Sequence, residues 1–128
     1  MKPLLLLFAC LSLSCHAADW PQFLGPNRDG SAAASEKPVD GREEAVTLWK
    51  KELGSGFAGP VIVNGQVIVF HRVGDEMVTE ALKAADGQTV WKHSYATDYR
   101  DSFGFDNGPR AVPAVLDGVV FTHGPEGR

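Results

Sequence analysis

Short runs of β-branched and aromatic residues, separated by turn-forming dipeptides, fill the chain from residue 46 onwards. We predict strands over 46–49, 60–63, 66–71, 76–82, 88–93, 111–116 and 119–123. Asn-Gly or Asp-Gly stands at 64–65, 86–87 and 117–118. These dipeptides are typical of two-residue hairpin turns, because both central residues of a type I′ turn need a positive φ. The pattern predicts an all-β fold of short antiparallel strands.

Part of this pattern is repeated. The stretch 60–65 aligns with 113–118 without gaps, at an offset of 53 residues. A period of about 50 residues with four short strands is the size of one β-propeller blade. One four-stranded blade cannot bury both of its faces alone, whereas blades stacked around an axis can. We therefore predict a complete repeat over 56–95 and the start of the next repeat over 108–128.

The first 17 residues are predicted to be a secretory signal peptide. A positive start is followed by an apolar run to Ser14, and small residues precede a cut before Ala18. The protein is therefore expected to be exported to the periplasm or cell envelope. Both cysteines, Cys10 and Cys15, lie in this segment, so no disulfide is expected in the mature chain. Cleavage before Cys15 followed by lipid attachment is the less favoured alternative.

Residues 18–45 are predicted to form an irregular N-terminal arm. Gly and Pro residues and the Asn-Arg-Asp-Gly sequence at 27–30 indicate turns. Trp20, Phe23 and Leu24 are large and apolar, so we expect all three to hold the arm against the rest of the protein. The Gly-Ser-Gly sequence at 54–56 is interpreted as a flexible lead into the strand that ends at Val63.

Composition narrows the class of partner. The chain has 128 residues, of which 44% are hydrophobic and 22% charged, and this is typical of a globular protein. The net charge is −4 and no Lys/Arg cluster stands out, so nucleic-acid binding is not expected. After the signal peptide, no apolar stretch approaches the roughly 18 residues of a membrane span. We therefore expect no transmembrane segment in the mature chain.

The polar and aromatic loop after residue 95 holds the candidate binding residues. Tyr99, Arg100, Asp106 and Arg110 are predicted to face a ligand or partner, because a rigid sheet can hold such a loop in place. The alternative, which we favour, is an internal role for the same loop. In that case Asp101 or Asp106 pairs with Arg110, and the phenylalanines at 103 and 105 cover the sheet.

The sequence gives no candidate catalytic or metal-binding residue. His71, His93 and His123 lack the short spacing of a metal-ligand pair, so we interpret them as solvated or capped. The serines are not part of a Gly-x-Ser-x-Gly nucleophile elbow, and no Gly-rich phosphate loop is present. The residues alone thus favour an architectural or binding role over catalysis.

Residues 81–91 resemble the repeat of the quinoprotein-type (PQQ-like) β-propellers, which reads Ala-x-Asp-x-x-Thr-Gly-x-x-x-Trp. Ala81, Gly87 and Trp91 match in spacing, whereas Lys83 replaces the Asp and Asp86 replaces the Thr. The resemblance extends to the two preceding strands and to the Trp-Pro-Gln-Phe-Leu-Gly-Pro-Asn-Arg-Asp-Gly segment at 20–30. It covers most of residues 19–128.

The resemblance implies a fold of antiparallel four-stranded blades, with a partial propeller over 46–128. A closed ring needs about 4–8 blades, so the rest of the propeller is expected outside this chain, which is interpreted as an N-terminal fragment. Leu48-Trp49-Lys50 is similar to Val90-Trp91-Lys92, which implies a strand of another blade at 46–49. Trp49 and Trp91 are expected to be packing residues rather than ligand platforms.

Two functions follow from the resemblance. The first is a binding or scaffold module of the cell envelope, similar to the propeller lipoprotein of the outer-membrane assembly machinery, with envelope proteins or a small ligand as partner. The alternative is an alcohol or sugar dehydrogenase that holds pyrroloquinoline quinone and calcium. No quinone-binding residue can be assigned in this chain, and many alcohol-oxidising members use adjacent cysteines that the mature chain lacks. We favour the binding module.

Overall fold

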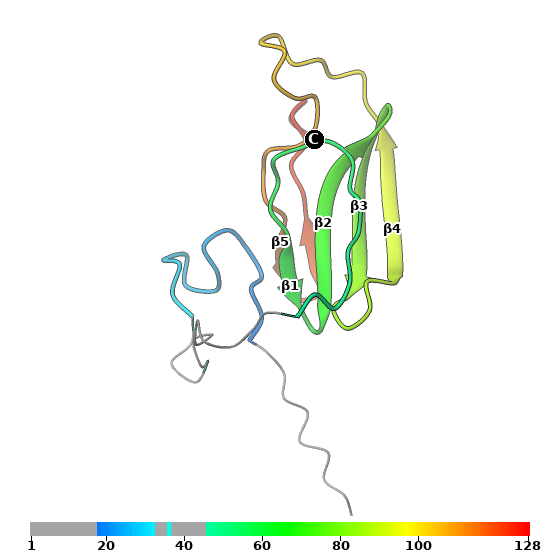
Figure 1. Cartoon of the computed structure of the whole chain (residues 1–128). Helices are drawn as coiled ribbons and strands as arrows, with labels where there is room; N and C mark the ends of the chain where they lie inside the picture. Colours follow the sequence, from blue (N-terminus) through cyan, green and yellow to red (C-terminus); the bar gives the residue numbers. More distant parts are fainter. Residues whose placement is uncertain (1–17, 33–35, 37–45) are drawn as a thin grey trace, which may run out of the picture.

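A computed structural model of the chain (Figure 1) describes residues 18–32, 36 and 46–128. The predicted signal peptide, with both cysteines, lies outside the described residues. All regular elements in the described part are strands, so the predicted all-β class is confirmed. The strands are β1 (Val61–Val63), β2 (Gln66–Val73), β3 (Glu76–Lys83), β4 (Thr89–Ala96), β5 (Ala114–Leu116) and β6 (Val119–Phe121).

The strands form two antiparallel sheets. The first has four strands in the order β1-β2-β3-β4, and the second is the hairpin β5–β6. The six observed strands correspond to six of the seven predicted ones. The turns at 64–65 and 117–118 are confirmed as type I′, because Asn64 and Gly65 have φ of 50° and 69°, and Asp117 and Gly118 have φ of 50° and 77°.

The predicted strand at 46–49 is wrong. Residues 46–57, which we call the strap, form no named strand and cross one face of the first sheet as extended chain (Figure 1). The strap makes only one isolated bridge to the sheet, between Ser55 and Arg72 of β2. The apolar pattern at 46–49 was correct for extended backbone, but a strand also needs a neighbouring strand for its hydrogen bonds.

The predicted two-residue turn at 86–87 is also wrong. Five residues, 84–88, connect β3 to β4, and only Gly87 of the Asp-Gly pair has a positive φ, of 72°. The strap explains the wider connection. The indole ring of Trp49 lies over Gly87, and its Nε1–H donates a 2.8 Å hydrogen bond to the carbonyl of Ala84.

The main apolar core lies between the two sheets. Val61, Ile68 and Ala81 are cross-strand neighbours on one face of the first sheet, and each is at most 4% exposed. Trp91 of β4 packs against them, as do Val115 and Val120 of the β5–β6 hairpin and Val112, two residues before β5. We call this the hairpin face, and the opposite face, which the strap crosses, the strap face.

The N-terminal arm is held mainly through its backbone. Trp20 and Ile62 of β1 exchange two backbone hydrogen bonds of 2.7 and 3.0 Å, and the N–H of Val115 donates to the carbonyl of Pro21. The arm thus joins the edge of the first sheet to β5. The expectation that Phe23 and Leu24 anchor the arm is wrong, since they are 66% and 42% exposed.

Candidate functional site

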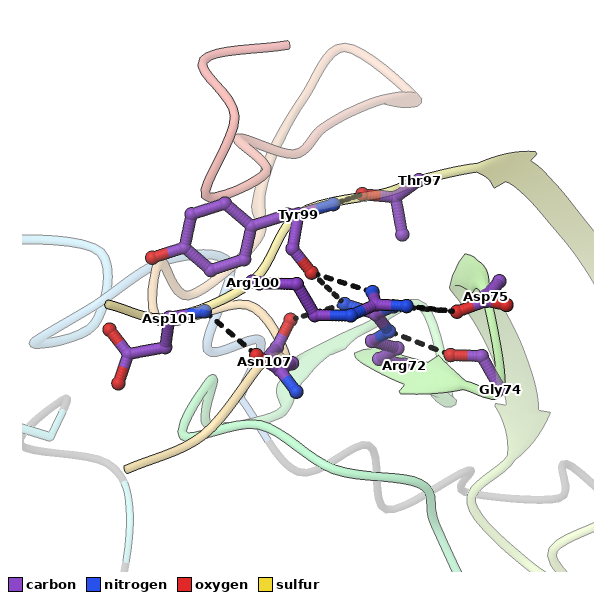
Figure 2. Close-up of polar contacts among 8 residues, drawn as sticks. All are labelled: Arg72, Gly74, Asp75, Thr97, Tyr99, Arg100, Asp101 and Asn107. Carbon is purple, nitrogen blue, oxygen red and sulfur yellow. Dashed lines mark hydrogen bonds and ion pairs between the residues drawn. The ribbon is translucent and has the colours of Figure 1, made fainter. Parts of the chain in front are cut away.

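A buried arginine organises one end of the molecule. Arg72 lies near the end of β2 on the hairpin face, and its side chain is only 4% exposed. Figure 2 shows its guanidinium group among backbone carbonyls. It donates to the carbonyls of Gly74 (2.7 Å), Tyr99 (2.7 Å) and Asn107 (3.2 Å), and to Oδ1 of Asp75 (2.9 Å). These bonds fix residues 97–110, which we call the site loop, to the hairpin between β2 and β3.

Asp101 fixes the interior of the site loop. Its backbone N–H donates to Oδ1 of Asn107 (2.8 Å), and its Oδ2 accepts from the N–H of Phe105 (2.7 Å). Its Oδ1 pairs with the guanidinium of Arg110 at 3.3 Å. The hydrogen bond from Phe105 is the largest influence on the pKa of Asp101 and lowers it, and Arg110 lowers it further. The carboxylate is therefore charged near neutral pH and holds the loop closed.

The four predicted binding residues all lie in the site loop and have partners within the loop or in the turn between β2 and β3. Arg110 donates 3.3 Å bonds to the hydroxyl of Tyr99 and to the carbonyl of Asp106. The carboxylate of Asp106 accepts from the N–H of Gly108 at 2.6 Å. Arg100 donates to Oδ1 of Asp75 at 3.2 Å. The structure brings these residues together, and many of their polar groups already have internal partners.

The phenylalanines of the site loop do not cover the sheet. Phe103 and Phe105 are 81% and 79% exposed. Their rings stack with centroids 6.4 Å apart and an interplanar angle of 24°. That part of the internal-role alternative is therefore wrong. The pair is an exposed apolar group on a loop whose base is held by Arg72 and Asp101.

An open cavity of about 460 Å³ lies beside the loop, and its lining includes both acidic and basic side chains. The lining residues are Asp75, Ala96, Thr97, Asp98, Arg100 and Arg128. Arg72 and Arg100 both contact Oδ1 of Asp75. The hydrogen bond from Arg72 is the first cause of a lowered pKa at Asp75, and Arg100 adds to it. The charges of Asp75 and Arg100, two of the residues that line the cavity, are therefore paired with each other.

The repeat-motif residues lie at contacts between segments. Ala81 is fully buried in the core between the sheets, and Trp91 packs beside it. Gly87 lies under the ring of Trp49, and a Cβ there would be 2.7 Å from the nearest ring carbon. Ala81, Trp91 and Gly87 thus each contact another segment of the same chain.

The described residues offer no ligand set for calcium or another metal, since no three His, Cys, Asp or Glu side chains gather at one point. His71 is 7% exposed and is bonded through Nδ1, while His93 and His123 are surface residues. Across the same residues, no helix has the length and apolar character to cross a membrane.

Sequence reasoning missed three residues that build the site: Arg72, Asp75 and Asn107. Arg72 follows the apolar run 67–70 and His71 in β2 and stands directly before Val-Gly-Asp. A charged residue with apolar neighbours in a strand is the signal that could have found it, because such residues are buried only when they are paired.

Comparison of the chain with protein-family models, curated proteins and solved structures gave no match.

Proposed function

We propose that this chain supplies the first blade, and the start of the second, of an exported β-propeller that acts as a binding or scaffold module in the cell envelope. The order β1-β2-β3-β4 follows the chain, as in a propeller blade. The hairpin β5–β6 lies against one face of that sheet, where a following blade would begin. The ring of Trp49 on Gly87 supports a blade-like repeat over 56–95, because it places the glycine of the repeat motif at a packing contact.

The site loop carries the binding role. Many polar groups of the site loop form contacts inside the protein, and these contacts hold the loop in one shape. Phe103 and Phe105 remain exposed, at 81% and 79%. A rigid, exposed aromatic pair loses little conformational freedom on binding and offers a large apolar area. This is the property expected of an anchor for a protein partner, since aromatic residues are enriched at the centres of interfaces.

The test is site-specific photo-crosslinking in the cells that produce the full-length protein. A photoreactive phenylalanine analogue replaces Phe103, and the matched control replaces Phe23, which is 66% exposed on the arm. We expect a discrete crosslinked product from position 103 and none from position 23. The same yield from both positions, or no product from 103, would contradict the proposal.

The dehydrogenase alternative is tested on the purified full-length protein. It is incubated with pyrroloquinoline quinone and calcium and assayed for dye reduction with alcohols and sugars. We expect neither quinone binding nor dye reduction. Turnover in this assay would overturn the scaffold proposal in favour of an enzyme.

A further inference from the structure

A buried histidine joins the strap to the first sheet. His71 lies on β2 on the strap face, and its Nδ1 accepts a 2.8 Å hydrogen bond from the backbone N–H of Gly54. A ring nitrogen that accepts a hydrogen bond carries no proton. His71 is therefore neutral in this arrangement, with its one proton on Nε2.

The other ring nitrogen is buried without a hydrogen-bond partner among the described residues. The nearest acceptor is Oε2 of Glu80, at 3.9 Å, which is too long for a hydrogen bond but close enough for an ion pair. The neutral ring thus leaves a donor unsatisfied, and a carboxylate stands beside it. A second proton on the ring would strengthen the attraction to Glu80.

Three charged groups face His71, each from a different element: Glu80 from β3, Lys92 from β4 and Lys51 from the strap. Burial is the largest influence and lowers the pKa of His71. Glu80 acts to raise that pKa, and the two lysines lower it further. The ring therefore stays neutral near neutral pH and takes up a proton only in a more acidic solution.

A second proton cannot be added without breaking the contact with the strap. Both nitrogens of a charged imidazole are donors, so Nδ1–H would point at the N–H of Gly54. Gly54 cannot shift deeper, because its Cα already lies against the backbone carbonyl of Arg72. We propose that His71 is a proton-operated latch, which releases the strap at Gly54 in mildly acidic solution.

Glu80 links the ring of His71 to the strap. Its Oε1 accepts from Lys51 of the strap at 2.8 Å and from the hydroxyl of Thr89, and its other oxygen, Oε2, faces Nε2 of His71. A charged His71 can therefore be held by Glu80 without displacing Lys51. Ser55 and Arg72 also exchange two backbone hydrogen bonds of 2.9 Å that do not titrate, so protonation of His71 opens the strap at Gly54 and leaves the neighbouring contact in place.

The strap ends against the site loop. The N–H groups of Phe57 and Ala58, at the end of the strap, both donate to the carbonyl of Pro109, at 2.8 and 3.1 Å. The latch itself does not depend on the proposed binding function, because it is defined by contacts within the chain.

The test is amide hydrogen exchange, measured by NMR on the full chain between about pH 7.5 and pH 5, the range in which a histidine titrates. Rates are corrected for the intrinsic effect of pH. We expect the protection of the Gly54 amide to fall about tenfold or more, as expected for local opening. The midpoint should lie below about pH 6.5 and coincide with the titration of the His71 ring.

Variants separate the latch from general acid effects. His71→Asn keeps an acceptor oxygen near the position of Nδ1 but does not titrate, so the Gly54 amide should stay protected at every pH tested. The matched control is His93→Asn, at an exposed position of β4, which should keep the wild-type response. Glu80→Gln should move the midpoint to lower pH, since the charge that favours protonation is removed.

Two results would overturn the latch. One is a wild-type protein in which the His71 ring titrates while the Gly54 amide remains protected. The other is His71→Asn losing protection over the same pH range as the wild type. If His71→Asn does not fold, the proposal is still tested by comparing the titration of His71 with the protection of the Gly54 amide in the wild-type protein.

Discussion

The two faces of the first sheet are covered in different ways. On the hairpin face, Ile68 and its neighbours pack against the β5–β6 hairpin through apolar side chains. The strap face also buries apolar side chains, those of Val69, Val78 and Leu82, but the strap adds single polar contacts there, such as Gly54 to His71 and Lys51 to Glu80. Apolar contact is non-directional and is indifferent to protons, whereas each polar contact can be removed by one change. The hairpin face is therefore held by contacts that a proton does not remove, whereas the strap face includes one contact, Gly54 to His71, that a proton can remove.

The largest effect is expected on the hairpin face. Ile68 is 4% exposed in the core between the sheets, so Ile68→Ala should lower the free energy of unfolding by about 4 kcal/mol through lost burial and a residual cavity. The measurement is urea unfolding. Ile62→Ala, at a position that is 39% exposed on the adjacent strand, is the control and should cost less than about 1.5 kcal/mol. Equal losses would mean that this core does not dominate stability.

The next effect concerns the end of the hairpin face. Arg72→Met leaves the carbonyls of Gly74, Tyr99 and Asn107 without their donor, and should cost about 3 kcal/mol. Limited proteolysis should then cut within the site loop. Arg100→Met is the matched control, because Arg100 is 61% exposed and its removal should change stability by less than about 0.5 kcal/mol. A protease-resistant loop in Arg72→Met would show that Arg72 does not hold it.

On the strap face, a smaller effect is expected at Gly87. Gly87→Ala places a methyl group 2.7 Å from the ring of Trp49 at a φ of 72°, and should cost about 2 kcal/mol. Gly118→Ala has the same backbone cost, at a φ of 77°, but open space around it, and should cost about 1 kcal/mol. Thermal unfolding of both variants measures the difference in stability between them. If the two variants lose the same stability, Trp49 is not fixed on the turn.

Mild acid should weaken the strap face alone, and this is the smallest effect. Because burial lowers the pKa of His71, the unfolded chain takes up the proton first as the pH falls below about 6.5, and stability declines until the pKa of the folded state is passed. One proton limits the slope to about 1.4 kcal/mol per pH unit. Urea unfolding at a series of pH values should show this slope in the wild type.

The same pH series contains its own controls. Ile68→Ala should keep the slope, because the hairpin face has no titrating group in its core, whereas His71→Asn should lose it. Burial acts to raise the pKa of Glu80, but the bonds from Lys51 and Thr89 outweigh it and lower that pKa. Any loss of stability from Glu80 therefore appears only as the pH falls through its lowered pKa, below 4.5, in a separate range. A slope in His71→Asn between about pH 6.5 and pH 5 would assign the effect to another group.

The sequence was most informative where structure is decided by neighbouring residues. The type I′ turns at 64–65 and 117–118 could be predicted because two adjacent residues set the geometry. The strands around them followed from runs of β-branched residues. All of the confirmed elements pair with a strand close in the chain, so local pattern and tertiary contact agree.

Prediction failed where the partner is distant. The apolar pattern at 46–49 does not reveal that Trp49 contacts a turn 35 residues away. The role of Arg72 depends on the carbonyl of Asn107, also 35 residues away. The exposure of Phe103 contradicts its hydrophobicity, because the side chain is placed by a loop whose shape polar bonds determine. These contacts are tertiary, and no local pattern contains them.

The position of the strap in the chain bears on the order of folding. Each pair of strands in the first sheet is joined by a turn of two to five residues, so its contacts are local and can form rapidly. The strap is made before β2, β3 and β4, yet it can dock only after those strands have paired. During synthesis it must therefore wait, undocked, while its own docking surface is built behind it. The strap is therefore synthesised before the sheet but is added to it last.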